Sequence, residues 1–291
     1  MTPVPAYESH RFASADGALE LFARIYPGEG PPLLLMHGLT RNSGDFELLA
    51  AHLASRYRLI VPDQRGRGLS DSDPNPANYR PDIYCADMFA LLDGLAIDRI
   101  GLIGTSMGGL MAMIMAHLAP ERVPAIVLND VGAALDPVGL ARIQGYVGPT
   151  SAAFESWEAA AARCARINGV AFPDFGPADW LAFARRTCRE DAQGQVRFAY
   201  DPAISESIKG SAPNTVPPDL WPLWDSLTGK PVLVLRGALS DLLSQQTVRE
   251  MDARHTGAFT AVDVPHRGHA PLLDEPVALE AIDAFLQEHV G

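Results

Sequence analysis

The sequence predicts an α/β fold, in which a mostly parallel, doubly wound sheet carries a helical insertion between its sixth and seventh strands. Short apolar runs of strand type alternate along the chain with segments of helical spacing. Such alternation is typical of a parallel sheet that is covered by helices on both faces. The alternation stops between about Leu135 and Trp224, where Ala-rich segments with several aromatic residues predict helices instead.

Each expected element follows from a local pattern. Alternating runs on either side of the turn Ala15-Asp-Gly17 predict an antiparallel hairpin over 8–14 and 19–26 at the sheet edge. Apolar runs predict strands over 33–37, 59–63, 100–104, 125–129, 232–236 and 259–264. Helical spacing predicts helices over 46–53, 83–95, 107–117, 245–254 and 277–289. The chain then divides into a core of residues 1–134 and 226–291 and an insertion of residues 135–225.

A candidate nucleophile stands where the strand over 100–104 meets the following helix. The sequence there is Gly104-Thr-Ser-Met-Gly108, so that Ser106 lies on a tight strand-to-helix turn between two glycines. A serine on such a turn has its hydroxyl lifted clear of the sheet. A glycine-rich turn that only joins a strand to a helix is the competing interpretation, and the residues expected near Ser106 decide between the two.

A base and an acid are expected further along the chain, after later strands of the same sheet. The loop after 232–236 contains Asp241, and the loop after 259–264 contains His266 and His269. The carboxyl ends of parallel strands meet at one edge, which is where ligands bind in such sheets. We therefore expect Ser106, His269 and Asp241 to meet there as nucleophile, base and acid.

Together these segments resemble the α/β-hydrolase superfamily over nearly the whole chain. The resemblance rests on Gly104–Gly108, Gly268-His-Ala-Pro271, the Asp241 loop, Met36-His-Gly-Leu39 and the segment 63–70. It implies that the backbone N–H groups of Leu39 and Met107 form an oxyanion hole and that the insertion is a lid over the site. It favours His269 over His266 as the base, and it offers Asp130, at the end of the sixth strand, as the alternative acid behind Asp241. His37 is expected to support the oxyanion loop, and Asp63 and Arg65 are expected to be structural.

Composition and charge exclude several classes of function. With 23 basic and 35 acidic residues the net charge is −12, which argues against nucleic acid and anionic membranes as partners. The longest apolar stretch is too short to span a bilayer, and the N-terminal residues lack the pattern of a secretory signal, so a cytoplasmic enzyme is expected. The three cysteines have no metal-binding spacing and are expected to be free thiols. No metal or other cofactor is expected, and a monomer and a homo-oligomer are both compatible with the sequence.

The expected reaction is hydrolysis of a small carboxylic ester or lactone. A serine at position 106 disfavours haloalkane dehalogenase and epoxide hydrolase activity, because the similar enzymes with those activities use an aspartate. Hydrolysis of a carbon–carbon bond in ring-cleavage products is the second hypothesis. A ligand-binding receptor on the same fold is a third, and the complete set of catalytic residue types argues against it.

Overall fold

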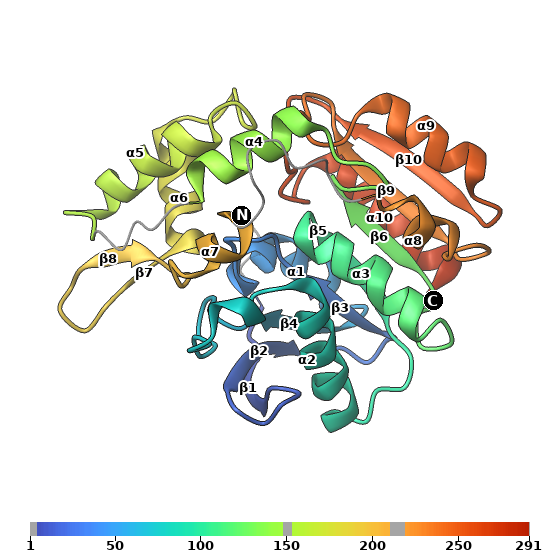
Figure 1. Cartoon of the computed structure of the whole chain (residues 1–291), viewed down its shortest axis with the longest axis horizontal. Helices are drawn as coiled ribbons and strands as arrows, with labels where there is room; N and C mark the ends of the chain where they lie inside the picture. Colours follow the sequence, from blue (N-terminus) through green and yellow to red (C-terminus); the bar gives the residue numbers. More distant parts are fainter. Residues whose placement is uncertain (1–4, 148–152, 210–218, 291) are drawn as a thin grey trace.

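The chain is organised around one mixed sheet. In residues 5–147, 153–209 and 219–290, which the computed structural model describes, eight strands pair in the order β1-β2-β4-β3-β5-β6-β9-β10 (Figure 1). The first two pairs, β1 with β2 and β2 with β4, are antiparallel, and the remaining pairs are parallel. The strands are β1 (Glu8–Ala13), β2 (Glu20–Tyr26), β3 (Pro32–Met36), β4 (Arg58–Asp63), β5 (Gly101–Thr105), β6 (Ile126–Asn129), β9 (Val232–Gly237) and β10 (Phe259–Val264). The predicted edge hairpin and the mostly parallel sheet are confirmed.

Helices cover both faces of this sheet because alternate strand residues point to opposite sides. Leu34 and Met36 of β3 belong to the core beneath α2 (Pro81–Gly94), α3 (Met107–Leu118) and α9 (Gln245–Arg254). Leu33 and Leu35 belong to the second core, beneath α1 (Glu47–Leu53) and α10 (Pro276–His289). Short 3-10 helices lie at η1 (Ser43–Phe46) and η2 (Pro76–Asn78). The sheet is therefore doubly wound, as predicted.

Element boundaries agree closely with the sequence pattern. The helix over 245–254 and the strand over 259–264 have the predicted bounds. Helix α2 begins two residues before its predicted start, because Pro81 occupies the first turn, where its missing N–H needs no partner.

The insertion between β6 and β9 has a small core of its own. It contains α4 (Pro137–Tyr146), α5 (Trp157–Asn168), α6 (Pro177–Thr187), α7 (Ile204–Lys209) and α8 (Trp221–Asp225), with the short hairpin β7 (Cys188–Glu190) and β8 (Val196–Phe198). Helices α4, α5 and α6 lie together on one side of the molecule, away from α2 (Figure 1). Phe172, Trp180 and Phe183 pack together there. The hairpin was not predicted.

Hydrogen bonds join the insertion to the core at separate points. The Asn42 amide donates to the carbonyl of Arg186 at 2.9 Å, and Arg189 donates to the carbonyl of Gly68 at 3.0 Å. The three cysteines are buried free thiols, as expected. Across the described ranges, every helix is too short or too polar to traverse a bilayer.

Candidate active site

Ser106 occupies the turn between β5 and α3 in a backbone conformation that few residues adopt. Its φ is 52° and its ψ is −112°. A Cβ atom on Gly104 would overlap the carbonyl oxygen of Gly108, and one on Gly108 would overlap the carbonyl oxygen of Met36 in β3. Both flanking glycines are therefore required by close backbone approach, and the turn presents the Ser106 hydroxyl at the carboxyl end of the sheet.

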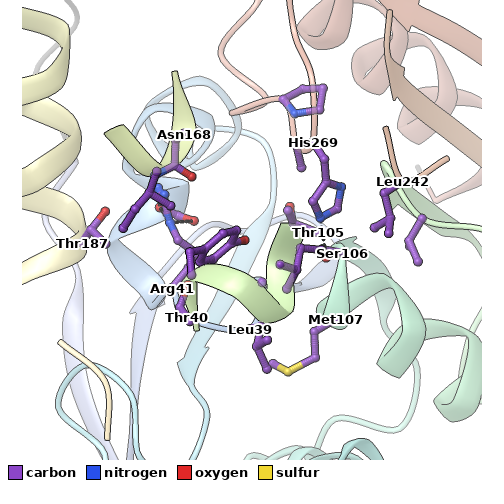
Figure 2. A pocket seen from close by; sticks show the side chains of 18 of the residues that line it. Leu39, Thr40, Arg41, Thr105, Ser106, Met107, Asn168, Thr187, Leu242 and His269 are labelled. Atoms are coloured by element: carbon purple, nitrogen blue, oxygen red, sulfur yellow. Dashed lines mark hydrogen bonds and ion pairs between the residues drawn. The ribbon is translucent and has the colours of Figure 1, made fainter. Parts of the chain in front are cut away.

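His269 lies directly against this hydroxyl. Its Nε2 atom is 2.8 Å from Ser106 Oγ, and the two side chains point toward each other in the cavity (Figure 2). On the other side of the ring, Nδ1 is 2.8 Å from Oδ2 of Asp130. A carboxylate accepts hydrogen bonds only, so Nδ1 carries the proton and Nε2 is free to accept the serine proton. The structure thus contains a continuous Ser106–His269–Asp130 hydrogen-bond chain.

Asp130 is held rigidly at the end of β6. It is fully buried, and its φ is 56°. Oδ1 accepts a hydrogen bond from the Gly237 N–H at 2.8 Å, while Oδ2 accepts one from the Ser240 hydroxyl at 2.6 Å as well as that from His269. A buried carboxylate with this many donors is fixed in position and kept ready to orient the imidazole.

The expectation that Asp241 contacts His269 is wrong. Arg142 of α4 binds both carboxylate oxygens of Asp241 through one edge of its guanidinium, with Nε 2.5 Å from Oδ2 and Nη2 2.8 Å from Oδ1. The hydrogen bonds from Arg142 lower the pKa of Asp241. The neighbouring Ser240 reaches Asp130 instead, so this loop supports the acid without supplying it. Arg142 lies in the insertion, far from Asp241 along the chain, and no pattern in the sequence indicated that these two residues form an ion pair.

Leu39 and Met107 both line the cavity beside Ser106, as the oxyanion-hole expectation requires (Figure 2). Met107 is the first residue of α3, where helix geometry leaves its N–H without a partner inside the helix. Gly38 lies close by, since a Cβ on it would be 3.8 Å from Ser106 Cβ. Leu39 and Met107 therefore both lie beside Ser106 at the carboxyl end of the sheet.

His37 supports the loop that carries Leu39. It is fully buried, its Nδ1 donates to the carbonyl of Gly38 at 2.7 Å, and its Nε2 accepts from the Gln64 N–H at 3.1 Å. Burial lowers the pKa of His37 to about 4, so the ring is neutral near pH 7. The carbonyl of Gly38 and the N–H of Leu39 belong to one planar peptide, so this bond also fixes where that N–H points.

Asp63 and Arg65 make the structural contacts expected of them. Asp63 accepts hydrogen bonds from the Ser43 N–H at 2.6 Å and the Leu69 N–H at 2.8 Å. Arg65 is buried and binds Asp87 at 2.7 Å and Asp73 at 2.6 Å. The Arg65 charge is thus neutralised by carboxylates inside the fold.

The cavity above Ser106 holds about 220 Å³ and is mostly apolar. Core and insertion both contribute apolar walls, among them Leu110, Val131, Leu140, Ile143, Phe172 and Phe198. Polar side chains gather at one end, where Arg41, Asn168 and Thr187 lie away from Ser106 and His269 (Figure 2).

Arg41 is a cavity residue that the sequence did not single out. Its Nε atom lies 2.7 and 2.9 Å from the carboxylate oxygens of Asp45, and its guanidinium is stacked 3.9 Å over the Phe183 ring. No cluster of three or more metal-ligating side chains was found in the described part of the chain.

The chain is similar to several known hydrolases. The sequence is 34% identical over 266 residues to 3-hydroxybutyrate-oligomer hydrolase of Cupriavidus necator, covering 89% of both chains. It is 30% identical to 2-(acetamidomethylene)succinate hydrolase of Mesorhizobium japonicum, again over 89% of each chain. Among solved structures, an alpha/beta hydrolase from Novosphingobium aromaticivorans superposes with a TM-score of 0.88 at 43% identity, over 97% of this chain and 98% of that one. The alpha/beta hydrolase fold family model matches residues 31–276. The chain belongs to the α/β-hydrolase fold family and is related to hydrolases of small substrates.

Proposed function

We propose that this protein is a serine hydrolase that cleaves a small carboxylic ester or lactone through an acyl-enzyme on Ser106. The observation that supports this most strongly is the hydrogen-bond chain from Ser106 through His269 to Asp130, with 2.8 Å at each step, at the base of a cavity. A serine hydroxyl becomes an effective nucleophile only when a neighbouring base can accept its proton, and that base works best when a carboxylate fixes its tautomer.

The proposed reaction has two halves. Ser106 Oγ attacks the ester carbonyl while Nε2 of His269 takes the hydroxyl proton, and the Leu39 and Met107 N–H groups bind the oxyanion. Collapse of the tetrahedral intermediate breaks the bond to the alcohol, which takes the proton from His269 as it leaves. Water then attacks the acyl-enzyme with His269 again as base, releasing the acid and restoring Ser106.

A short ester of a hydroxy acid is the favoured substrate class. The cavity of about 220 Å³ has room for a short acyl group, and its apolar walls suit a hydrocarbon chain. The polar end at Arg41, Asn168 and Thr187 provides hydrogen-bonding partners for a hydroxyl or carboxyl oxygen at some distance from the ester. A related hydrolase is named for 3-hydroxybutyrate oligomers, which are linked by carboxylic esters.

Initial rates test the proposal directly. We would compare p-nitrophenyl esters from acetate to octanoate and the linear dimer and trimer of 3-hydroxybutyrate, using wild type, Ser106→Ala and the control Ser226→Ala. The Ser226 hydroxyl bonds only a nearby carbonyl, so its loss should leave the rates unchanged. We expect turnover of short esters and of the dimer, abolished in Ser106→Ala alone. No turnover of any ester would refute the proposal, and cleavage of a vinylogous diketone instead would favour carbon–carbon bond hydrolysis.

A further inference from the structure

Arg67 is a buried arginine that lies under both residues of the proposed oxyanion hole. It belongs to the segment between β4 and α2, and its side chain is almost completely inaccessible to solvent. Nε donates to the carbonyl of Leu39 at 3.0 Å, and Nη2 lies 3.8 Å from Sδ of Met107. One guanidinium therefore contacts both residues of the proposed oxyanion hole, although Leu39 follows β3 and Met107 begins α3 after β5.

The contacts on the other side of Arg67 anchor it to the core. Nη1 donates to the carbonyl of Arg65 and to the hydroxyl of Tyr84, both at 2.8 Å. The guanidinium also lies 4.8 Å from the centre of the Tyr84 ring, within the range of a cation–π contact. A planar guanidinium with its donors bound on two sides has little freedom to rotate, so the Leu39 carbonyl is held at a fixed position.

This contact complements the one made by His37. His37 holds the carbonyl of the peptide between Gly38 and Leu39, and Arg67 holds the carbonyl of the next peptide, between Leu39 and Thr40. Two consecutive planar peptides are thus fixed, one on each side of the Leu39 Cα. The direction of the Leu39 N–H depends on both.

The electrostatic surroundings of Arg67 differ from those of its neighbour Arg65. Arg65 is paired with Asp73 and Asp87, whereas within the described ranges no carboxylate forms an ion pair with Arg67. The partners of Arg67 are carbonyl oxygens, a hydroxyl, a sulfur atom and aromatic rings. Positive charge next to a site where negative charge develops stabilises the transition state more than the neutral ground state.

We propose that Arg67 is a positioning residue for the oxyanion hole, holding Leu39 and Met107 so that their N–H groups converge on the carbonyl oxygen as it becomes negative. Its unpaired charge adds to the stabilisation of that anion. This inference rests on the proposed serine-hydrolase function. Its effect falls on the transition state, so Arg67 contributes to kcat more than to KM.

The test uses Arg67→Met and Arg67→Lys, with Arg122→Met as the matched control. Arg67→Met removes the charge and both contacts to the hole, and Arg67→Lys keeps the charge. Arg122→Met makes the same change at an arginine that donates to the carbonyls of Ile97 and Asp98, which precede β5 and so lie at the opposite end of the sheet from Ser106. We would measure kcat and KM on the best p-nitrophenyl ester, and the inhibition constant of an alkylboronic acid, which forms a tetrahedral anionic adduct with an active-site serine. Melting temperature and circular dichroism report folding in each variant.

For Arg67→Met we expect kcat to fall by about 100-fold, with KM changed by less than about threefold, because loss of one oxyanion donor has an effect of that order. The affinity for the boronic acid should fall by about the same factor as kcat. Arg67→Lys should recover part of both losses, and Arg122→Met should keep kcat within about threefold of wild type. If Arg67→Met does not fold, the kinetics of Arg67→Lys alone test the inference. We then expect kcat to fall by about tenfold at constant KM, because the Leu39 carbonyl is displaced.

Three results would overturn the inference alone while wild type remains active: unchanged kcat in a folded Arg67 variant, a lower kcat with unchanged boronic acid affinity, or equal losses in Arg122→Met and Arg67→Met. A wild type that neither hydrolyses esters nor binds the boronic acid would instead refute the proposed function, and with it this inference.

Discussion

Replacing Asp130 with asparagine separates the two carboxylates that could serve as the acid. Asp130→Asn has nearly the same shape, but its amide cannot hold three hydrogen bonds from His269, Gly237 and Ser240 as the carboxylate does. The His269 ring would then adopt the wrong tautomer or lose its partner. In a Ser-His-Asp arrangement this change costs about 10⁴-fold in kcat, or about 5.5 kcal/mol of transition-state stabilisation.

Asp241→Asn is the matched control, because it makes the same chemical change at a carboxylate that binds Arg142, whereas the imidazole of His269 binds Asp130. The side chains of Arg142 and Asp241 are 20% and 28% exposed, and such a pair contributes at most about 1 kcal/mol to stability. We therefore expect kcat to stay within about threefold of wild type.

The assay is steady-state hydrolysis of a p-nitrophenyl ester near pH 8 by both variants, with circular dichroism to confirm folding. The reverse pattern, a large loss in Asp241→Asn and a small one in Asp130→Asn, would refute the assignment of the acid.

Three further predictions concern stability, measured by urea unfolding. Gly108→Ala should lower the free energy of unfolding by about 3 kcal/mol, because its Cβ would overlap a β3 carbonyl. Asp87→Asn should cost about 3 kcal/mol, since it leaves the buried Arg65 with one close carboxylate fewer. Unfolding raises the pKa of His37 from about 4 toward 6.5, so the unfolded chain binds more protons and the free energy of unfolding falls as the pH is lowered. Between pH 7.5 and pH 4.5 this residue should account for a loss of about 2.5 kcal/mol that is missing in His37→Asn.

Each stability prediction has a control in the same fold. Gly94→Ala at the end of α2 meets open space and should not destabilise the protein. Asp82→Asn breaks an exposed pair with Arg80 and should change stability by less than about 1 kcal/mol. Equal losses in a variant and its control, or the same pH dependence in wild type and His37→Asn, would contradict the corresponding reasoning.

The sequence was sufficient to predict the eight-stranded sheet, because its parts are encoded locally, but not the β7–β8 hairpin of the insertion. The strands are short buried runs, and the turn at Ser106 is forced by two glycines. The edge hairpin of β1 and β2 follows from Asp16-Gly17 between alternating runs. For the candidate base, the pattern placed His266 and His269 in the loop after β10 at the carboxyl edge of the sheet, and the resemblance to the α/β-hydrolase superfamily favoured His269, which lies against Ser106. The strands, the turn and the edge hairpin depend on periodicity and backbone sterics, which a single sequence displays.

The acid and the shape of the cavity could not be predicted in this way. Asp130 and Asp241 both follow strands at the same edge, and the choice between them depends on Arg142, whose position is set by the packing of the insertion. Arg41 and Arg67 belong to loops whose side-chain directions depend on distant contacts, with Phe183 in one case and Leu39 in the other. Long-range packing of this kind leaves no periodic pattern in the sequence.

Trapping the acyl-enzyme is the most direct test of the serine mechanism. Wild type and Ser106→Ala would each be mixed with p-nitrophenyl butyrate, quenched in acid within milliseconds to seconds, and analysed by intact-mass and peptide-mapping mass spectrometry. The mechanism predicts a butyryl adduct on the peptide containing Ser106 in wild type, formed during the burst of p-nitrophenol, and no adduct in Ser106→Ala. Turnover by Ser106→Ala at the wild-type rate, or an adduct on another residue in wild type, would contradict it.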